Sequence, residues 1–392
     1  MSRRRETGER VAGRPDYALL LIVAVLTITG LITVYSASFV IGLAWYGDPN
    51  YFILRQAMWA GLGLVLMVVA MQSDYRVLRS MAVPIMAFTI LMLLAVLVIG
   101  AEGGGARRWL GSGPYTIQPA EFAKLAVIIY LAAWLAAKGN SIRSLEEGLI
   151  PFVLIIGSVA VLIVLEPNLG TTLIILLITV TMFYVAGATL LQMTALGVTG
   201  LISMAILATA AGYRLDRLYS YFDAEGDPLG RGFQTLQSLI ALGNGGITGL
   251  GLGTSRGKFF YIPESHTDGV FAVLGEEAGL IATSMVVLLF VTLMLRGYHI
   301  ARRAPDDFGT LVATGITTWI AVQAMLNIGG ITRTIPLTGV PLPFLSYGGS
   351  ALASVMLAMG VLLSITRYMP NSSSYLDRVR EPARRVVRRA KA

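Results

Sequence analysis

Long apolar runs separated by short polar segments make up most of the 392-residue chain. Each run is roughly 20 residues long, which is the length that an α-helix needs to cross the hydrocarbon core of a bilayer. We therefore expect an all-α, polytopic membrane protein with a basic N-terminal segment (1–16), a membrane domain (17–368) and a basic tail (369–392). The pattern predicts ten membrane helices, at residues 17–38, 57–73, 81–100, 120–137, 148–165, 170–188, 190–211, 269–296, 309–330 and 347–366.

The composition supports a membrane protein and disfavours several other classes. Hydrophobic residues make up 55% of the chain and charged residues only 13%, whereas soluble domains carry about 25% charged residues. The absence of cysteine excludes disulfides and thiol chemistry, and the two histidines lie too far apart in sequence to favour a histidine-based metal site. The first apolar run is too long for a signal peptide. We find no internal repeat, so a transporter built from inverted repeats gains no support.

Lysine and arginine gather on one side of the predicted membrane domain. The N-terminal segment and the tail are both basic, and an even number of spans places them on the same side. The loops at 74–80, 138–147 and 297–308 add further cations to that side. Cationic loops face the cytoplasm, so both termini are expected there and segment 212–268 becomes a large extracytoplasmic loop. The net charge of +8 therefore fits contact with anionic lipid rather than with nucleic acid.

Several cations fall on the outward side, against this bias. Long loops cross membranes largely regardless of charge, which accounts for the cations within 212–268. It accounts less well for Arg107 and Arg108, because their loop is short. Arginine matches the geometry of phosphate, so we interpret these cations as an anion site at the outer surface. The outward cations are Arg55, Arg107, Arg108, Arg214, Arg217, Arg231, Arg256, Lys258 and Arg333.

The predicted span at 120–137 begins with an ionisable pair. Glu121 and Lys124 lie three residues apart, so their side chains share one face of the helix. Ionisable residues at the mouth of a membrane helix are candidates for function. A structural ion pair that holds this helix to a neighbour would have the same spacing, and both interpretations stay open.

Segment 212–268 is the longest region outside the predicted spans. Residues 233–242 have helical apolar spacing, which predicts a helix lying in the membrane interface. The glycine-rich stretch after it contains GTSRGK, which lacks the glycine and the Ser/Thr of a phosphate-binding loop. The chain has no Asp-x-Asp triplet either, which argues against a soluble nucleotide-sugar donor.

The stretch YIPESHTDGVFAVLGEE (261–277) places acids where an apolar span begins. Asp268 stands just before this span, where a carboxylate could cap the helix N-terminus. Glu276 and Glu277 lie about 12 Å further along at 1.5 Å per residue, inside the span. Carboxylates within a membrane must face a cavity or a partner. We therefore expect a polar cavity that opens outward, with Asp268 at its mouth.

These motifs together resemble the SEDS family of membrane glycosyltransferases, which includes RodA, FtsW and SpoVE. The matching segments are GARRWL, QPAEFAK, LEPNLGT, GFQTLQSLIALGNGGITGLGLG, YIPESHTDGVFAVLGEE and GVPLPFLSYGGSAL. They occur in the family's order and cover nearly the whole chain between the first and last spans. The departures are Asn168 where the family usually has Asp, Ala120 where it has Ser, and Gly269 where it has Phe.

The resemblance implies a peptidoglycan glycosyltransferase that polymerises lipid II at the outer face of the bacterial cytoplasmic membrane. It implies that Asp268 matches the acidic residue proposed to be catalytic in the family. The carboxylate of Asp268 would serve as general base, while cations would stabilise the departing diphosphate. It also implies a class B penicillin-binding protein as partner. The residues expected to contact substrate are Arg107, Arg108, Trp109, Glu121, Lys124, Arg214, Arg217, Gln234, Lys258, His266, Glu276 and Ser346.

Two other functions compete with this interpretation. A lipid II flippase would also need a cation-lined cavity, but it requires a polar path to the cytoplasmic side, where the spans carry few ionisable residues. A scaffold for the elongation or division machinery would not need Asp268. No cofactor or metal site is indicated by the sequence, and a divalent cation, Mg²⁺ or Mn²⁺, is the alternative counter-charge for the diphosphate.

Overall fold

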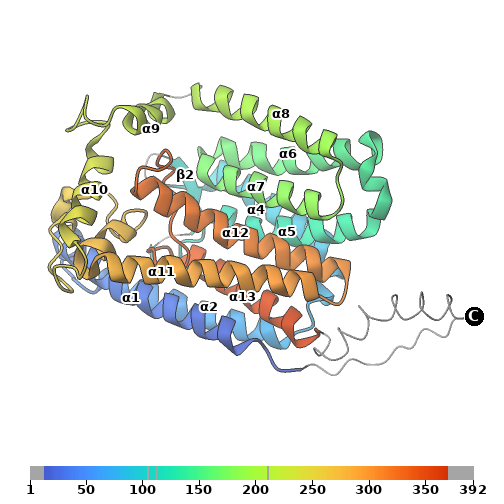
Figure 1. The fold of residues 1–392 in the computed structure, drawn as a ribbon, viewed down its shortest axis with the longest axis horizontal. Coiled ribbons are helices and arrows are strands. Elements are labelled where there is room, and N and C mark those ends of the chain that lie inside the picture. Colours follow the sequence, from blue (N-terminus) through green and yellow to red (C-terminus); the bar gives the residue numbers. More distant parts are fainter. Residues whose placement is uncertain (1–12, 104–105, 112, 210–211, 370–392) are drawn as a thin grey trace, which may run out of the picture.

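The computed structural model describes residues 13–103, 106–111, 113–209 and 212–369, so most of the predicted N-terminal segment and tail lies outside the described residues. Long helices lie side by side along the longest axis of the molecule (Figure 1). One end of this bundle carries Gly13, the loop before α12 and the last turn of α13, and we call it the termini end. The opposite end carries the hairpin β1–β2, α9 and α10, and we call it the long-loop end.

Within the described ranges, eight helices are long and apolar enough to cross a membrane, which confirms the all-α polytopic fold. Two shorter apolar helices, α7 and α8, coincide with the sixth and seventh predicted spans, so the count of ten stays a prediction. The eight long helices and these two shorter ones are α1 (Tyr17–Tyr46), α2 (Tyr51–Gln72), α4 (Ala82–Ile99), α5 (Pro119–Lys138), α6 (Ile150–Leu165), α7 (Leu169–Val185), α8 (Leu190–Thr209), α11 (Val270–Arg303), α12 (Asp307–Ile331) and α13 (Gly349–Arg367). The short elements are α3 (Val77–Ser80), β1 (Ala101–Gly103), β2 (Ala106–Trp109), η1 (Gly113–Tyr115), η2 (Gly139–Arg143), η3 (Leu145–Leu149), α9 (Gly212–Phe222), α10 (Phe233–Gly245) and η4 (Gly257–Tyr261).

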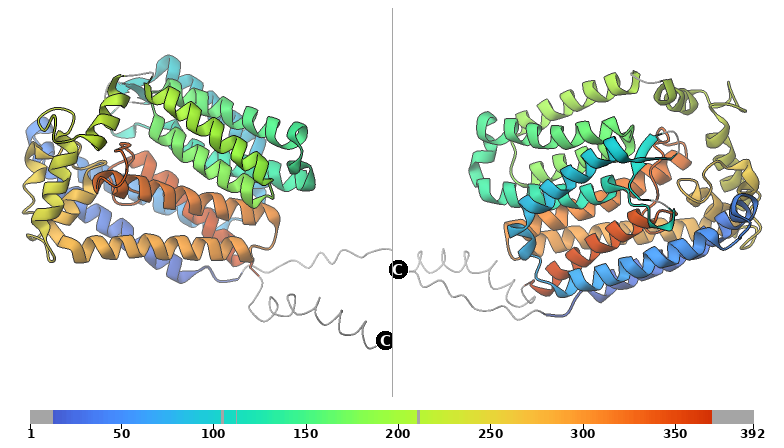
Figure 2. Two further views of the ribbon diagram at one scale, coloured as in Figure 1. Left: turned by 45° about the horizontal axis from the view of Figure 1, so that its top comes forward. Right: turned by 180° about the vertical axis from the view of Figure 1, so that it is seen from behind.

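The helices α12 and α13 form the centre of the bundle. In their apolar windows 78% and 83% of residues are buried inside the protein, against 28% for α2 and α11. α12 packs against α5, α7 and α11, and α13 packs chiefly against α2 (Figure 2). A Cβ atom at Gly360 would lie 2.4 Å from the carbonyl oxygen of Met67, so glycine permits the close approach of α13 to α2. Small residues at membrane helix contacts serve this purpose generally.

The helix α11 is broken at Gly279, where the sequence predicts a continuous span. Gly279 has φ +73°, and the chain from Gly246 to Gly251 enters the break. That chain replaces the missing helical hydrogen bonds on both sides, which matters because an unsatisfied backbone group is costly inside a membrane. The replacement bonds run from the N–H of Leu250 to Glu276 O (3.0 Å), Gly251 to Glu277 O (2.9 Å), Leu280 to Gly246 O (2.9 Å) and Ile281 to Ile247 O (3.2 Å).

Residues 332–348, which we call the proline segment, re-enter the bundle between α12 and α13 without forming a helix. Its Leu342, Phe344 and Leu345 are buried, and a Cβ at Gly30 of α1 would lie only 2.1 Å from Phe344 O. Amide side chains on the neighbouring helices bind its backbone. Irregular backbone is tolerated at membrane depth where protein surrounds it, as here. The amide contacts are Gln323 Nε2 to Pro341 O (2.9 Å), Asn327 Nδ2 to Val340 O (2.8 Å) and Gln56 Nε2 to Ser346 O (3.2 Å).

At the termini end, side chains tie the loop after α2 to the start of α12. The Tyr75 hydroxyl donates to Asp306 Oδ2 at 2.5 Å, and the other oxygen of Asp306 accepts from the N–H of Gly309. Tyr75 is buried. This polar contact is separated from the long-loop end by the length of α12.

The broken helix can be tested with Gly279→Ala. The new Cβ would lie 2.3 Å from the backbone nitrogen of Gly249, and alanine disfavours φ +73°. We expect the free energy of unfolding to fall by at least about 1 kcal/mol, measured as a lower melting temperature of the purified protein in detergent. Gly157→Ala is the matched control, since nothing lies within 4 Å of its Cβ and φ there is helical. Equal melting temperatures for the two variants would contradict the break.

Candidate functional site

Asp268 lies at the end of a tight turn directly before α11. The turn is closed by the N–H groups of Thr267 and Gly269, which both donate to Glu264 O at 3.0 Å. The N-cap of α11 is Gly269, with no side-chain capping bond, so the alternative role of Asp268 as helix cap is wrong. The Asp268 side chain is 8% exposed and its Oδ2 accepts from Gln234 Nε2 of α10 at 3.4 Å. The helix predicted near 233–242 is therefore present and contributes a polar contact to this carboxylate.

The surroundings of Asp268 leave its carboxyl able to accept a proton. Burial, followed by the nearby negative charge of Glu264, raises the pKa of Asp268 to about 6. The positive charge of Arg217 and the hydrogen bond from Gln234 act in the opposite direction and favour the carboxylate. A general base works best with a pKa near the working pH, because it is then both deprotonated and basic.

Arg217 is the outward cation that the fold brings into electrostatic range of Asp268. It lies on α9, and its guanidinium covers Gly339 so closely that a Cβ there would lie 2.8 Å from Nη2. α9 is held to the proline segment by Arg333, whose Nε donates to Tyr221 O at 3.1 Å. Arg214 belongs to the same helix, and its side chain lies outside the described part of the structure.

The backbone around Asp268 is held by residues from other helices. Asn327 of α12 donates from Nδ2 to Asp268 O at 2.9 Å, and the N–H of Tyr347 donates to His266 O at 2.8 Å. The His266 ring packs between Phe52 and Tyr347, with centroid distances of 4.7 and 5.5 Å. Burial lowers the pKa of His266, so its ring is a neutral packing group near neutral pH. Asn327 was missed by the sequence analysis, although an amide within an apolar span is a signal that could have identified it.

Glu121 and Lys124 form the predicted pair. Lys124 Nζ donates to Glu121 Oε2 at 2.8 Å and to Gln323 Oε1 at 2.9 Å, and it lies 4.7 Å from the centre of the Trp319 ring. Both members of the pair are buried, and their partners Gln323 and Trp319 belong to α12. Because Gln323 also binds Pro341 O, this pair joins α5 to α12 and to the proline segment. The structural interpretation of the spacing thus holds, and any substrate contact remains a prediction.

Lys258 is paired with Glu277, and any contact between Lys258 and substrate remains a prediction. Its Nζ lies 3.0 Å from Glu277 Oε1 in a buried ion pair. Glu276 accepts from the hydroxyl of Ser255 and from the N–H of Gly257. These two acids therefore bind the loop before Asp268, and the outward-opening polar cavity expected around them stays a prediction.

Arg107, Arg108 and Trp109 lie on β2, at the long-loop end. Arg107 is exposed, while Arg108 Nε donates to Glu166 O at 2.9 Å. The Glu166 side chain lies in the turn between α6 and α7 and is fully buried, and among the described residues neither carboxylate oxygen has a hydrogen-bond partner. Burial raises its pKa to about 8 despite the charge of Arg108. The sequence analysis missed this acid, which occupies the conspicuous Glu-Pro step of LEPNLGT.

Two remaining positions have mainly structural contacts. Asn168, which replaces the family's usual Asp, caps α7 by accepting from the N–H of Thr171 at 3.2 Å. Ser346 Oγ accepts from the N–H of Leu342 at 2.7 Å and so fixes a turn of the proline segment. A contact between Ser346 and substrate stays a prediction.

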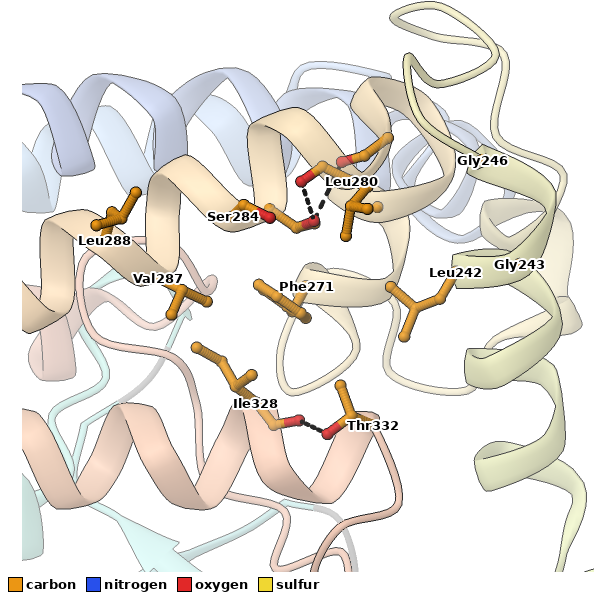
Figure 3. Close-up of a pocket in the computed structure, with 13 residues that line it drawn as sticks. Leu242, Gly243, Gly246, Phe271, Leu280, Ser284, Val287, Leu288, Ile328 and Thr332 are labelled. Carbon is orange, nitrogen blue, oxygen red and sulfur yellow. Dashed lines mark hydrogen bonds between the residues drawn. The ribbon is translucent and has the colours of Figure 1, made fainter.

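An apolar groove of about 710 Å³ adjoins the Asp268 turn between α10, α11 and α12. Leu242, Phe271, Leu280 and Ile328 point into it (Figure 3). A second apolar groove of about 1010 Å³ lies between α2, α4, α5 and α13. It extends from Ser73 and Tyr75 at the termini end to Leu110 and Tyr115 at the long-loop end. The described residues include no group of three or more His, Asp or Glu side chains suited to a metal ion.

Comparison with known proteins decides the family. The family model for cell cycle proteins of the FtsW, RodA and SpoVE type matches residues 17–371. The chain belongs to this family. It is 44% identical to stage V sporulation protein E of Bacillus subtilis over 90% of this chain and 97% of that protein. It is 37% identical to a probable peptidoglycan glycosyltransferase FtsW of Geobacter sulfurreducens, over 90% and 95% of the two chains.

Solved structures of the FtsW/RodA/SpoVE family share the fold. A chain from a peptidoglycan synthase complex, described as coordinating polymerisation and crosslinking, aligns with a TM-score of 0.73 and 28% identity, covering 90% of this chain and 98% of that one. RodA of Thermus thermophilus aligns with a TM-score of 0.68 and 26% identity over 91% and 98% of the two chains. Family membership and the shared fold extend over the whole membrane domain.

The Glu121–Lys124 pair predicts that the losses of stability caused by replacing each residue alone do not add in the double variant. We expect Glu121→Gln and Lys124→Met each to lower the melting temperature, because each leaves a buried charge or donor unpaired. The double variant should be more stable than the sum of the single effects implies, with a coupling of about 0.5–3 kcal/mol. Additive losses in the double-mutant cycle would show that the two side chains do not interact.

Proposed function

We propose that this protein is a peptidoglycan glycosyltransferase that polymerises lipid II into glycan strands. The observation that carries the proposal is the buried carboxylate of Asp268, held with a pKa near 6 within range of Arg217 and beside an apolar groove. The names of the family relatives support the same activity. Assays of the purified protein with its partner and lipid II, read as polymer length, test it directly.

The chemistry requires a base and a counter-charge on the same side of the membrane. A sugar hydroxyl attacks the anomeric carbon of a second lipid II molecule, and its proton passes to Asp268. The bond from the anomeric carbon to the phosphate oxygen breaks, and the electron pair leaves with the lipid diphosphate. Arg217 is the described cation that is placed to offset this charge. Mg²⁺ or Mn²⁺ is the other candidate, and loss of polymer in EDTA with recovery on adding the ion would distinguish it.

The apolar grooves fit the lipid part of such a substrate. The larger groove is lined mainly by aliphatic and aromatic side chains, and the smaller one by such side chains together with glycines and the hydroxyl residues Thr283, Ser284 and Thr332. Both match the largely apolar character of a polyprenyl chain. Phe271, which lines one groove, follows Asp268 by three residues, so a tail held there keeps a headgroup near the carboxylate. The lipid-facing location of the site follows from this arrangement.

The flippase alternative gains less support. The groove that reaches from one end of the bundle to the other contains few polar side chains, mainly Ser73, Asp74 and Thr89 near the termini end. A disaccharide headgroup would need polar contacts along the whole path, because burying unpaired hydroxyls is costly. A scaffold would need neither the raised pKa nor the nearby cation of Asp268.

The expected setting is the bacterial cytoplasmic membrane, with the termini end in the cytoplasm and the Asp268 site facing outward. The distribution of Lys and Arg in the sequence supports this orientation. The proposed partner is a class B penicillin-binding protein that supplies the crosslinking activity. The similarity to a chain of a synthase complex that combines polymerisation with crosslinking supports such a partner. The activity would serve elongation or division.

Asp268→Asn should abolish polymerisation. The amide cannot accept the proton, and loss of a general base typically costs about 10²–10⁴ in rate. The measurement is glycan polymer formed by the purified variant with its partner. Asp306→Asn is the matched control, since it makes the same change at the opposite end of the bundle and should leave the rate intact. Near-normal polymerisation by Asp268→Asn would remove the carboxylate from the mechanism.

The charges around Asp268 predict two opposite pH shifts. The base acts when deprotonated, so kcat/KM should fall as pH drops through about 6. Arg217→Met removes a charge that lowers the pKa of Asp268, so the acidic limb should move to higher pH. Glu264→Gln removes a charge that raises the pKa, so the limb should move to lower pH. Limbs that stay in place, or move in the same direction, would contradict the assignment of Asp268 as the titrating base.

A further inference from the structure

The chain from Ser255 to Glu277 forms a closed loop that carries Asp268. Its two ends are joined by side chains rather than by a helix or sheet. At one end, Ser255 and Lys258 precede the turn that contains Asp268, and at the other, Glu276 and Glu277 follow it within α11. We call the contacts between these ends the carboxylate clamp.

Each acid in the clamp binds more than one group of the opposite end. Glu276 Oε2 accepts from Ser255 Oγ at 2.5 Å and from the N–H of Gly257 at 3.1 Å. Glu277 Oε1 accepts from Lys258 Nζ at 3.0 Å and from the N–H of Ser255 at 3.3 Å. All of these side chains are buried. The clamp is therefore a fully enclosed polar cluster, which fixes geometry only when every member is paired.

A third element anchors the clamp to the rest of the bundle. Ser36 of α1 donates from Oγ to Glu277 Oε1 at 2.6 Å, and Lys258 Nζ also lies 3.4 Å from this hydroxyl. Lys258 further donates to Gly253 O. The loop that carries Asp268 is thus tied both to its own helix and to α1.

The break at Gly279 explains why the loop that carries Asp268 needs these contacts to be held in place. Because α11 is interrupted there, the segment from Val270 to Ala278 does not inherit the rigidity of the long helix that follows. Within this segment the carbonyls of Glu276 and Glu277 bind the loop at Leu250 and Gly251, and their carboxylates bind Ser255 and Lys258. Backbone and side chains of the same two residues hold one short structural unit.

We propose that Glu277 and Lys258 are positioning residues for the glycosyl transfer, which hold the Asp268 loop in register with Arg217 and the apolar groove. The inference rests on the proposed function and assigns these side chains no contact with substrate. Asp268 follows Lys258 by only ten positions, so a displacement at the base of the loop reaches the carboxylate. A misplacement of about 1 Å in a catalytic group can cost about 10²-fold in rate.

Two variants separate the effect of the ion pair on the position of the Asp268 loop from its effect on the stability of the fold. Glu277→Gln leaves Lys258 buried without its counter-charge and should be destabilised. The double variant Lys258→Met with Glu277→Gln removes both charges and should melt close to the wild type. If the pair positions the loop, turnover of lipid II should stay about 10²-fold low in both variants. If it only stabilises the fold, turnover in the double variant should return to normal, which would overturn the proposal.

The position of the loop can be measured directly, because the chain has no cysteine to compete for labels. Spin labels at Tyr261→Cys and Leu62→Cys, both exposed positions, report the distance between the loop and α2. We expect one narrow distance distribution in the otherwise unchanged protein and a broad or shifted one in the double variant. An unchanged narrow distribution together with normal turnover would also overturn the proposal.

Gln192→Leu is the control for a general loss of stability. It removes the hydrogen bonds that the buried Gln192 side chain donates to Ile142 O and Ser144 O, so it should lower the melting temperature without changing turnover or the label distance. The activity of Asp268→Asn and the label distance in the double variant distinguish a failure of the proposed function from a failure of the clamp. If Asp268→Asn remains active while the label distance broadens in the double variant, the clamp stands and the role of Asp268 falls.

Discussion

The structure depends on hydrogen-bond partners for the polar backbone groups that lie inside an apolar bundle. Two stretches give up helical hydrogen bonds at membrane depth, the break in α11 at Gly279 and the proline segment between α12 and α13. Each becomes stable because other parts of the chain replace the missing partners, Leu250 and Gly251 in the first case and Asn327 and Gln323 in the second. The turn that carries Asp268 lies between these two irregular stretches. A local exception to helix formation thus creates a place where a carboxylate can be presented at the edge of the bundle.

Pairing distinguishes the buried lysines from Asp268, the proposed base. Lys124 and Lys258 are buried, and each has a carboxylate partner at 3.0 Å or less. Among the described contacts Asp268 has no ion pair: its carboxylate accepts hydrogen bonds of 3.4 Å from Gln234 Nε2 and from Thr267 Oγ1, and it lies in the field of Arg217. Buried charges are normally neutralised by close partners, so a carboxylate without one keeps a raised pKa and remains available for proton transfer. The same criterion marks Glu166 as a neutral acid near pH 7, held in a turn whose carbonyl binds Arg108.

The fold could be predicted from hydrophobic runs because each span is long and uninterrupted. The predicted positions of α1, α5, α12 and α13 agree with the helices to within a few residues at most ends, and α1 extends further, to Tyr46. The break in α11 could not be predicted, since Gly279 alone is compatible with a continuous helix and its partner chain lies some thirty residues earlier. The helix α10 was predictable because its apolar spacing is local.

The site was predictable only in part, for a physical reason. Spacing along one helix revealed the Glu121–Lys124 pair, because residues three apart share a face. The charge bias identified the outward cations but not their partners, so the ion pair of Lys258 with Glu277 was not predicted. Partners from distant segments, such as Asn327 beneath Asp268 or Ser36 beside Glu277, depend on tertiary packing that a single sequence does not display.

The uneven distribution of polar side chains bears on how a lipid-linked sugar can be handled. The carboxylates, the arginines of the site and the amides that hold the proline segment lie toward the long-loop end, whereas the long groove between α2 and α5 is apolar over most of its length. We therefore expect a polar headgroup to be accommodated at one end only, with its tail extending along the bundle. Such an arrangement favours chemistry on a headgroup already present at that end over transport of the headgroup through the protein.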